Sequence, residues 1–185
     1  SYLKGGTSMT KNEANGIWVF AEQKNGVLDK TPLELISKAL ELKQTTGEEV
    51  TALLIGSDVA ELTDTLIAYG ADKVIVAENE NLKSYSGRPY QKVVADITAK
   101  YKPSIFIFPA TAQGRDLAPR VMCTLGTGLT ADAVDLGFDD EGALGELRVK
   151  KTREIFLLLT LQENWKNSER KFTIYAVLTK SKNLF

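Results

Sequence analysis

A cluster of polar and charged residues between Thr111 and Arg120 has the composition of an anion-binding helix start. Gln113 and Gly114 belong to a short loop, and Arg115 and Arg120 add two guanidinium groups. The first backbone N–H groups of a helix carry a partial positive charge, so together with the arginines they favour a carboxylate or a phosphate. The sequence therefore predicts an anion-binding or interface site in this segment.

Each of these residues also has a structural interpretation. Asp116 can serve as the N-cap of the helix, a role worth on the order of 1 kcal/mol. Pro119 is expected in the first turn, where an N–H group has no partner within the helix. Gly126 is expected to end the helix, and with Gly128 and Thr130 it is expected to bring further N–H groups to the site. The candidate cofactor-binding or interface residues are Thr111, Gln113, Gly114, Arg115, Asp116, Arg120, Gly126, Gly128, Thr130 and Asp132.

The residues before this segment predict the strand that positions it. The run from Ile105 to Phe108 is apolar and rich in β-forming residues, which is typical of a strand buried on both faces of a parallel sheet. Pro109 ends that strand. A strand end, a glycine-containing loop and a helix start together form the crevice in which open α/β sheets bind ligands. We therefore expect the loop from Thr111 to Gly114 at the ligand-binding edge of a sheet.

Apolar runs and amphipathic segments alternate along the chain. Strands are expected at residues 17–21, 50–55, 74–77 and 105–108, with helices at about 31–46, 59–69 and 90–101. This alternation implies right-handed βαβ units. We therefore predict the fold class α/β, a three-layer α/β/α sandwich with a mainly parallel sheet. The first four strands are expected in the order third, second, first, fourth, which makes the first and fourth strands neighbours.

Helical spacing and turn chemistry predict the placement of individual side chains. Thr31 is expected to cap the first helix, and Ile67 is expected on the buried face of the second. Cys123 is interpreted as a core thiol on an apolar helix face. Lys102 is expected to be extended because Pro103 follows it. The expected core includes Leu40, Leu53, Ile55, Leu66, Val76, Ile97, Ile107 and Val121.

The pattern changes after Asp132, where no further helix is expected. Residues 133–138 and 144–149 are expected to pair as a hairpin across an acidic turn. The apolar runs 155–161 and 172–178 are expected to add antiparallel strands near the C-terminus.

The composition describes one ordinary globular domain, with 43% hydrophobic and 25% charged residues. We expect a single domain over residues 16–185 behind a flexible N-terminal arm, residues 1–15. A net charge of −1 gives no electrostatic attraction to nucleic acid, and no apolar run is long enough to insert into a membrane. The chain has no histidine and one cysteine, which excludes an intramolecular disulfide, a Cys/His zinc site and a Ser-His-Asp triad. We therefore expect no metal and no catalytic side chain.

Two segments of the candidate site, Gly114–Arg120 and Leu125–Asp132, resemble the signature of the electron transfer flavoprotein alpha subunit family. Further matches in the same order and approximate spacing lie at Gly16–Glu22, Ile67–Val74 and Lys100–Pro103. The resemblance covers about residues 16–147, which corresponds to the amino-terminal domain of that family.

The resemblance implies a fold similar to adenine nucleotide alpha hydrolases and a role in FAD-dependent electron transfer to or from dehydrogenases. It implies that FAD is bound mainly by a carboxy-terminal domain that nothing in this chain resembles, so no tight flavin site is expected here. The implied partners are a beta subunit, in a heterodimer, and flavin-dependent dehydrogenases. The implied location is the cytoplasm, or the mitochondrial matrix in a eukaryote, and the implied role is that of an electron carrier subunit and not of an enzyme.

Two alternatives stay open. After Lys150 the chain lacks the arginine-, proline- and glycine-rich segment of the family, so residues 150–185 are expected to form a divergent tail, through divergence of the lineage or an altered reading frame. The alternative function is a free-standing adenine-nucleotide-binding module of the universal stress protein class. Against it, the chain lacks the signature of that class, a Gly-x-x-Gly run with a later Gly-Ser/Thr, and it has neither Gly-x-Gly-x-x-Gly nor a phosphate-binding loop with lysine.

Overall fold

The computed structural model describes residues 14–131, 135–138, 147–150 and 157–160. The expected arm at residues 1–15 therefore lies almost entirely outside the described residues. The apolar run at residues 172–178 also lies outside the described residues. Of the divergent tail, only residues 150 and 157–160 are described.

A six-stranded sheet forms the centre of the molecule, and the expected order of its first four strands is confirmed. The strands lie in the order β5-β4-β1-β6-β10-β7, and β5, β4, β1 and β6 are parallel to one another. The bounds of these four are β1 Ile17–Ala21, β4 Val50–Gly56, β5 Lys73–Glu78 and β6 Ile105–Ile107. In the register of the central pair, Val19 of β1 lies opposite both Ala52 of β4 and Ile107 of β6.

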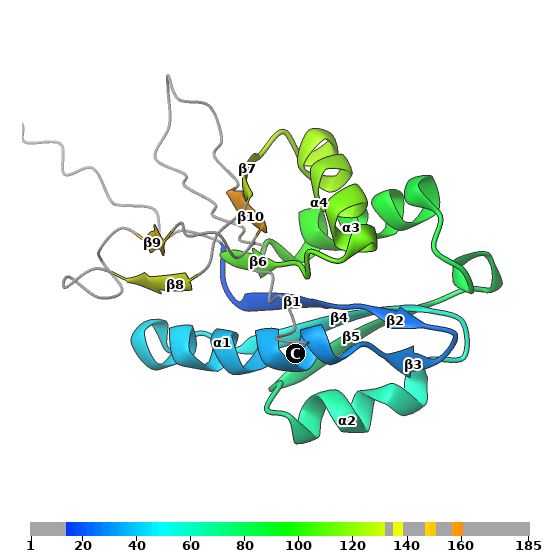
Figure 1. Cartoon of the computed structure of the whole chain (residues 1–185), viewed down its shortest axis with the longest axis horizontal. Coiled ribbons are helices and arrows are strands. Elements are labelled where there is room, and N and C mark those ends of the chain that lie inside the picture. The colour runs from blue at the N-terminus through cyan, green and yellow to red at the C-terminus, as the bar shows by residue number, and fades with distance from the viewer. Residues whose placement is uncertain (1–13, 132–134, 139–146, 151–156, 161–185) are drawn as a thin grey trace, which may run out of the picture.

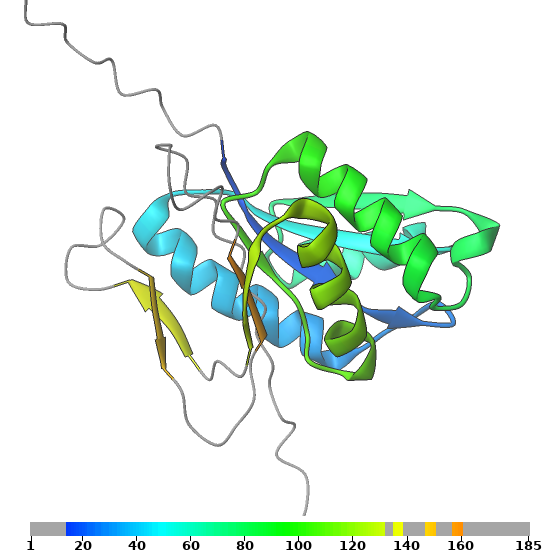
Figure 2. The same cartoon turned by 90° about the horizontal axis from the view of Figure 1, so that it is seen from above.

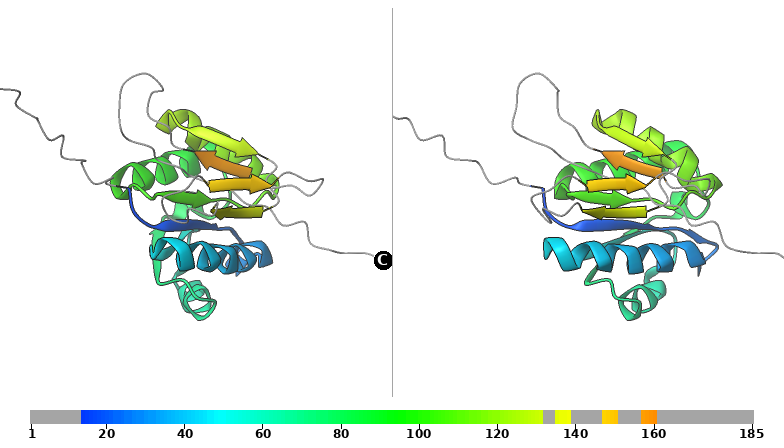
Figure 3. Two further views of the ribbon diagram at one scale, coloured as in Figure 1. Left: turned by 90° about the vertical axis from the view of Figure 1, so that its left-hand side faces the viewer. Right: turned by 60° about the vertical axis from the view of Figure 1, so that its left-hand side comes forward.

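Helices cover both faces of the sheet, as Figure 1 shows, with α1 and α2 on one face and α3 and α4 on the other. The three layers are seen edge-on in Figure 3. The side chains of β1 alternate between the layers: Ile17 and Val19 belong to the core on the α1 side, whereas Trp18 and Phe20 belong to the core on the α3 and α4 side. Both sets are buried because the sheet has a helical layer on each face. The fold is therefore the expected α/β sandwich.

Helix α1 (Lys30–Thr46) begins two residues earlier than expected, because its N-cap is Asp29 and not Thr31. The Asp29 carboxylate accepts hydrogen bonds from the Thr31 backbone N–H (2.9 Å) and from the Thr31 hydroxyl (2.7 Å). Gly47 ends the helix in the left-handed conformation. Between β4 and β5 the expected single helix is a 3-10 turn, η1 (Ala60–Leu62), followed by a short α2 (Thr63–Ala68). With so short a helix only Leu66 is buried, and Ile67 is 47% exposed, so its expected burial is wrong.

A 3-10 turn, η2 (Glu80–Leu82), precedes helix α3 (Gly87–Tyr101). Lys102 follows α3 with φ 49° and ψ 65°, so the expectation of an extended residue before Pro103 is wrong. The left-handed conformation lets the Lys102 N–H donate to the Thr98 carbonyl and close the last turn of the helix.

Helix α4 (Ala112–Leu125) packs beside α3, as the view from above in Figure 2 shows. Its buried residues are Gly114, Leu117, Ala118 and Val121, which share one face at helical spacing. Cys123 is exposed, so its interpretation as a core thiol is wrong. Two residues correspond to a rotation of about 200° around a helix, which places Cys123 on the face opposite Val121.

The C-terminal strands divide between two sheets. Strand β10 (Leu157–Thr160) pairs antiparallel with β6 and with β7 (Gly128–Ala131), which extends the central sheet as expected. Strands β8 (Asp135–Phe138) and β9 (Leu147–Lys150) form the expected hairpin as a separate two-stranded sheet. A second small hairpin, β2 (Gln23–Lys24) with β3 (Val27–Leu28), turns at Asn25 and Gly26, which both have positive φ.

The expected core is confirmed where the central strands and helices meet. Five of its residues have at most 1% of their surface exposed: Leu53, Ile55, Leu66, Ile107 and Val121. The other three, Leu40, Val76 and Ile97, are only partly buried. Val76 is partly buried because β5 is the edge strand of the sheet, with a neighbour on one side only.

Candidate functional site

The start of α4 lies at the carboxyl end of β6, beside the carboxyl end of β1. Thr111 is the N-cap residue, and its hydroxyl oxygen accepts the Gly114 N–H at 3.0 Å. The expected capping role of Asp116 is therefore wrong, because the cap lies five residues earlier and Asp116 is in the second turn. Pro119 likewise lies in the interior of the helix and not in its first turn, so the Arg115 carbonyl lacks the usual helical hydrogen bond.

Asp116 joins α4 to the loop before α3. Its carboxylate accepts hydrogen bonds from the Arg120 guanidinium at 2.9–3.0 Å and from the Tyr85 hydroxyl at 2.6 Å. The bond from Arg120, and then that from Tyr85, hold the pKa of the Asp116 carboxyl below its usual range. Burial, and then the bond to Asp116, raise the pKa of the Tyr85 hydroxyl. Asp116 and Arg120 therefore fix the position of Tyr85.

Glu22 lies directly after β1 and faces the first turn of α4. The Thr111 hydroxyl donates a hydrogen bond to the Glu22 carboxylate, which joins the ends of β1 and β6 at the point where the strand order reverses. Burial raises the pKa of the Glu22 carboxyl, and the bond from Thr111 partly offsets this rise. The sheet edge predicted from the sequence therefore carries a desolvated carboxyl group next to a helix N-terminus.

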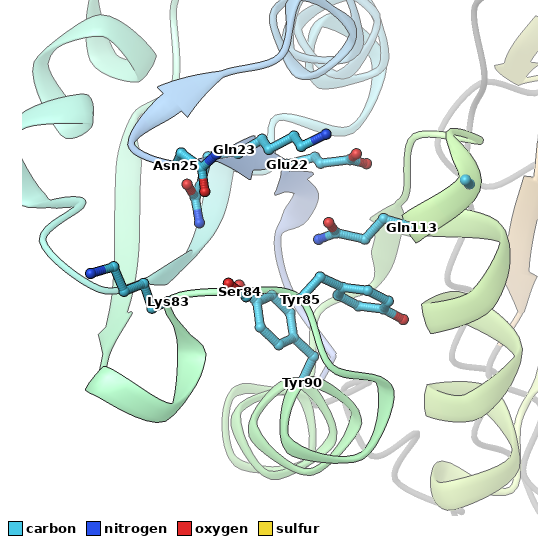
Figure 4. A pocket seen from close by; sticks show the side chains of 10 residues that line it. Glu22, Gln23, Asn25, Lys83, Ser84, Tyr85, Tyr90 and Gln113 are labelled. Atoms are coloured by element: carbon cyan, nitrogen blue, oxygen red, sulfur yellow. The ribbon is translucent and has the colours of Figure 1, made fainter.

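A cavity of about 420 Å³ opens at this edge of the sheet. It is lined by Glu22 to Asn25 on one side, by Lys83 to Tyr85 and Tyr90 on the other, and by the first two residues of α4. Figure 4 shows the Gln113 side chain pointing from α4 into the cavity, between Glu22 above it and the Tyr85 ring below it. The cavity combines one carboxyl group, several amides, a hydroxyl and aromatic rings, an arrangement that can bind a small polar molecule.

Of the ten sequence-predicted residues, Thr111 and Gln113 belong to this edge directly, and Gly114 packs against the backbone behind it. Arg115 is exposed, and its Nε donates to the Ala110 carbonyl at 3.2 Å.

The other predicted residues lie further away. Gly126 is the left-handed C-cap of α4, so it lies at the end of the helix opposite Thr111, about 20 Å away for a helix of this length. Gly128 and Thr130 are in β7, which is separated from β6 by β10. The structure does not bring these glycines to the first loop as expected. Asp132 lies outside the described residues.

Of the residues that line the cavity, the sequence indicated Gln113 as a site residue but not the rest of the wall. Gln23 is buried, its Nε2 donates to the Ile55 carbonyl at 3.0 Å, and its Oε1 accepts from the Gly26 N–H at 3.0 Å. Tyr85 lies in a polar loop, and Tyr90 lies just after that loop. Their rings meet edge to face with centroids 5.0 Å apart. An aromatic residue inside an otherwise polar loop is the one signal that could have indicated this wall.

The described residues do not make up a site for FAD. The first turn of α4 faces the carboxylate of Glu22, so it offers no cradle for a pyrophosphate group. The cavity is also at the small end of the range for ligand pockets, whereas FAD is a dinucleotide. Within the described ranges there is no cluster of three or more His, Cys, Asp and Glu side chains that could hold a metal ion. No helix in that same part of the chain is long and apolar enough to cross a membrane.

Comparison with known proteins assigns the chain to a family. The model of the electron transfer flavoprotein domain matches residues 17–165. The chain belongs to the electron transfer flavoprotein family. This confirms the resemblance seen at Gly114–Arg120 and Leu125–Asp132. In the part of this electron transfer flavoprotein chain that the structure describes, the first of these segments forms half of α4.

Several relatives of this electron transfer flavoprotein chain are alpha subunits. The chain is 44% identical over 133 residues to the electron transfer flavoprotein subunit alpha of Clostridium acetobutylicum, covering 72% of this chain and 40% of that protein. It is 47% identical over 129 residues to the subunit alpha of Megasphaera elsdenii, covering 70% and 38%. A further relative is the acryloyl-CoA reductase electron transfer subunit beta of Anaerotignum propionicum, 40% identical over 144 residues, covering 78% and 39%. The chain spans about two fifths of the length of these curated relatives.

Proposed function

We propose that this chain acts as the amino-terminal domain of an electron transfer flavoprotein alpha subunit, a scaffold that contacts a beta subunit in FAD-dependent electron transfer to or from dehydrogenases. The observation that carries the proposal is the family match over residues 17–165, with the signature segment Gly114–Arg120 inside α4. The redox chemistry would belong to a flavin held mainly by protein outside this chain. A cytoplasmic location goes with this proposal.

The outer face of α4 supports a role in contacting a partner. Arg115 and Arg120 are exposed on this helix, and neither is needed to fill the core. Arg120 is held by Asp116 in an ion pair of 2.9 Å, so its guanidinium is fixed in place. Arg115 is tethered through Nε to the Ala110 carbonyl, one residue before the N-cap. Two guanidinium groups in fixed positions on one helix suit recognition of partner carboxylates or carbonyls.

The side chains that line the cavity are not arranged for catalysis by themselves. The one carboxyl group of the cavity whose pKa is raised, Glu22, hydrogen-bonds to a threonine hydroxyl and not to a second acid or base. We infer that the domain sets geometry and partner contacts, while the electron carrier is the flavin. An electron carrier subunit is therefore favoured over an enzyme acting alone.

The test is association of this chain with an electron transfer flavoprotein beta subunit, measured by isothermal titration calorimetry. We expect binding, and we expect Arg115→Ala to weaken it by about 1–3 kcal/mol, the range for a lost charge-assisted hydrogen bond. The melting temperature should change little because Arg115 is exposed.

Lys92→Ala is the matched control, because Lys92 is an exposed cation on α3 that pairs only with Asp96 of the same helix at 2.7 Å among the described residues. This variant should bind the beta subunit like the wild type. The proposal fails if no association is measured at micromolar concentrations. The interface on α4 is wrong if Lys92→Ala weakens binding as much as Arg115→Ala does.

A further inference from the structure

The start of α3 lies against the ion pair that Asp116 and Arg120 form on α4. A Cβ atom on Gly87, the first residue of α3, would lie 3.0 Å from the Arg120 Nε atom and 3.1 Å from the Asp116 Oδ2 atom. The two helices meet again one turn further along, where the Gln91 side chain donates a hydrogen bond to the Thr124 hydroxyl at 2.6 Å. Side chains at the surface therefore tie α3 to α4 on both sides of this contact.

The guanidinium of Arg120 is held along one edge and open along the other. Its Nε and Nη2 atoms donate to the carboxylate oxygens of Asp116 at 2.9–3.0 Å. Its Nη1 atom donates to no atom of the described residues, and the side chain is 44% exposed. A guanidinium that is already held in place loses little conformational freedom when its remaining N–H groups bind a second carboxylate.

The first turn of α3 adds positive charge beside Arg120. Arg88, the second residue of α3, is exposed and forms no ion pair or side-chain hydrogen bond with another of the described residues. The N-cap residue Ser86 makes no side-chain hydrogen bond to the helix, and the first turn contains no acidic residue. A cation at a helix N-terminus is unfavourable, because the first N–H groups already carry a partial positive charge. An anion bound here would relieve this repulsion.

The arginine corner, which consists of Gly87, Arg88, Asp116 and Arg120, carries a net positive charge. Its arginines supply two positive charges, and Asp116 supplies one negative charge. Lys92, one turn further along α3, pairs with Asp96 at 2.7 Å and adds no uncompensated charge. The cavity at the sheet edge does not include the two arginines, and both are exposed. A small anion would therefore stay hydrated at this corner, whereas a protein surface would exclude the water.

We propose that the arginine corner docks a carboxylate side chain of the beta subunit, which binds Arg88 and the open edge of Arg120. In this arrangement Asp116 is a positioning residue, because it acts through the guanidinium that it holds. The inference rests on the proposed function and goes beyond it, since the interface then includes the start of α3 as well as the outer face of α4. Charge complementarity requires an acidic partner surface at this point.

The test is binding of the beta subunit to the 185-residue chain, measured by isothermal titration calorimetry with arginine variants. Arg88→Ala should weaken binding about fivefold and Arg120→Ala about tenfold or more, because each variant loses a charged contact. Arg88→Ala should also leave the melting temperature of the chain alone unchanged or slightly raised, since it removes a cation from a helix N-terminus. A residue with a merely structural role would not weaken binding while it preserves stability.

Lys73→Ala is the matched control for the arginine variants. Lys73 is an exposed cation that pairs with Glu49 at 2.9 Å. It lies at the amino end of the edge strand β5, whereas α3 starts on the side of the carboxyl ends of the strands. This variant should bind the beta subunit like the wild type.

Cys123, the single cysteine of the chain, reports on the same surface without any substitution. It is exposed and lies three residues after Arg120, so the two side chains are neighbours on the helix surface. An interface of ordinary size that includes Arg120 would cover it, so the beta subunit should slow its alkylation by N-ethylmaleimide at least about fivefold. Mass spectrometry of this chain measures the rate. An unchanged rate in the complex would place the interface elsewhere and overturn the inference.

The outcomes separate this inference from the proposed function. If the beta subunit binds and both arginine variants bind it like the wild type, the inference is wrong and the proposed function stands. If the wild-type chain does not bind the beta subunit, both are wrong. Asp116→Asn should weaken binding although it removes a negative charge, because Arg120 is then held less firmly. Tighter binding of this variant would show that net charge alone attracts the partner and would overturn the role of Asp116.

Discussion

The carbonyl oxygen of Pro109 lies 1.6 Å from the position that a Cβ atom would occupy on Gly114. This contact lets the first turn of α4 pack directly against the end of β6, and it leaves no room for any side chain. Because the obstructing atom is backbone, it cannot move aside without shifting the strand end. The close approach explains why a glycine stands at the third position of this helix.

We therefore expect Gly114→Ala to destabilise the protein by about 3 kcal/mol or more, from steric overlap and the resulting backbone shift. Urea denaturation measures the effect. Gly137→Ala is the control, because a Cβ at Gly137 would meet no atom within 4 Å and its φ is not positive. A control that costs as much as Gly114→Ala would show that the Pro109 contact is not the cause.

Burial of the Glu22 carboxyl predicts a pH dependence of stability. The pKa of Glu22 is higher in the folded protein than in the unfolded chain. Deprotonation therefore lowers the stability as the pH rises from the unfolded-state pKa through the folded-state pKa. Glu22→Gln lacks this cost while its amide oxygen can still accept from Thr111. The stability of the variant relative to the wild type should therefore increase between pH 4 and pH 7. Urea denaturation at both pH values tests this, and a constant difference would contradict it.

Asp72 stabilises the start of β4 from across the sheet. Its carboxylate pairs with Lys43 of α1 and accepts the Val50 N–H at 2.7 Å, and the bond from Lys43, followed by that from Val50, lowers the pKa of the Asp72 carboxyl. Asp72→Ala would leave the N–H of a fully buried residue without this acceptor, at a cost of about 2 kcal/mol near neutral pH.

The pKa of Asp72 is lower in the folded protein than in the unfolded chain. The stabilisation by its carboxylate is therefore complete at pH values above the unfolded-state pKa, and it is lost as the pH falls through the folded-state pKa. Asp96→Ala is the matched control, since among the described residues Asp96 forms only an exposed pair with Lys92 and should contribute less than about 0.5 kcal/mol. Thermal unfolding of both variants at pH 7 decides the comparison, and equal losses would refute the role of Asp72.

Ile107 lies in the strand that carries the site, with none of its surface exposed. We expect Ile107→Ala to cost about 2–5 kcal/mol, because the lost side chain leaves a cavity between β6 and the core on the α1 side of the sheet. Denaturant unfolding measures the loss. A change within about 0.5 kcal/mol would mean that the neighbouring side chains fill the space.

The sequence by itself determined the framework of this protein. The alternation of apolar runs with amphipathic segments gave the parallel strands and their order, because strand and helix periods differ and crossovers have one hand. The run from Ile105 to Phe108, followed by Thr111 and Gly114, located the start of α4 at the ligand-binding edge. The segments Gly114–Arg120 and Leu125–Asp132, with three further matches upstream, indicated the family.

The tertiary structure alone decided which partners the polar groups of this edge have. Asp29 and Thr111 act as caps in place of Thr31 and Asp116, because several nearby side chains can cap a helix and the packing of its first turn selects one.

The cavity wall needed the fold as well, because Tyr85 meets Asp116 and Thr111 meets Glu22 across 31 and 89 positions of the chain. Contacts between residues so far apart leave no periodic trace in the sequence. The hydrogen bond between Glu22 and the N-cap of α4 is a further example. Glu22 is far from α4 in the sequence, and the two meet only because β1 and β6 pair side by side.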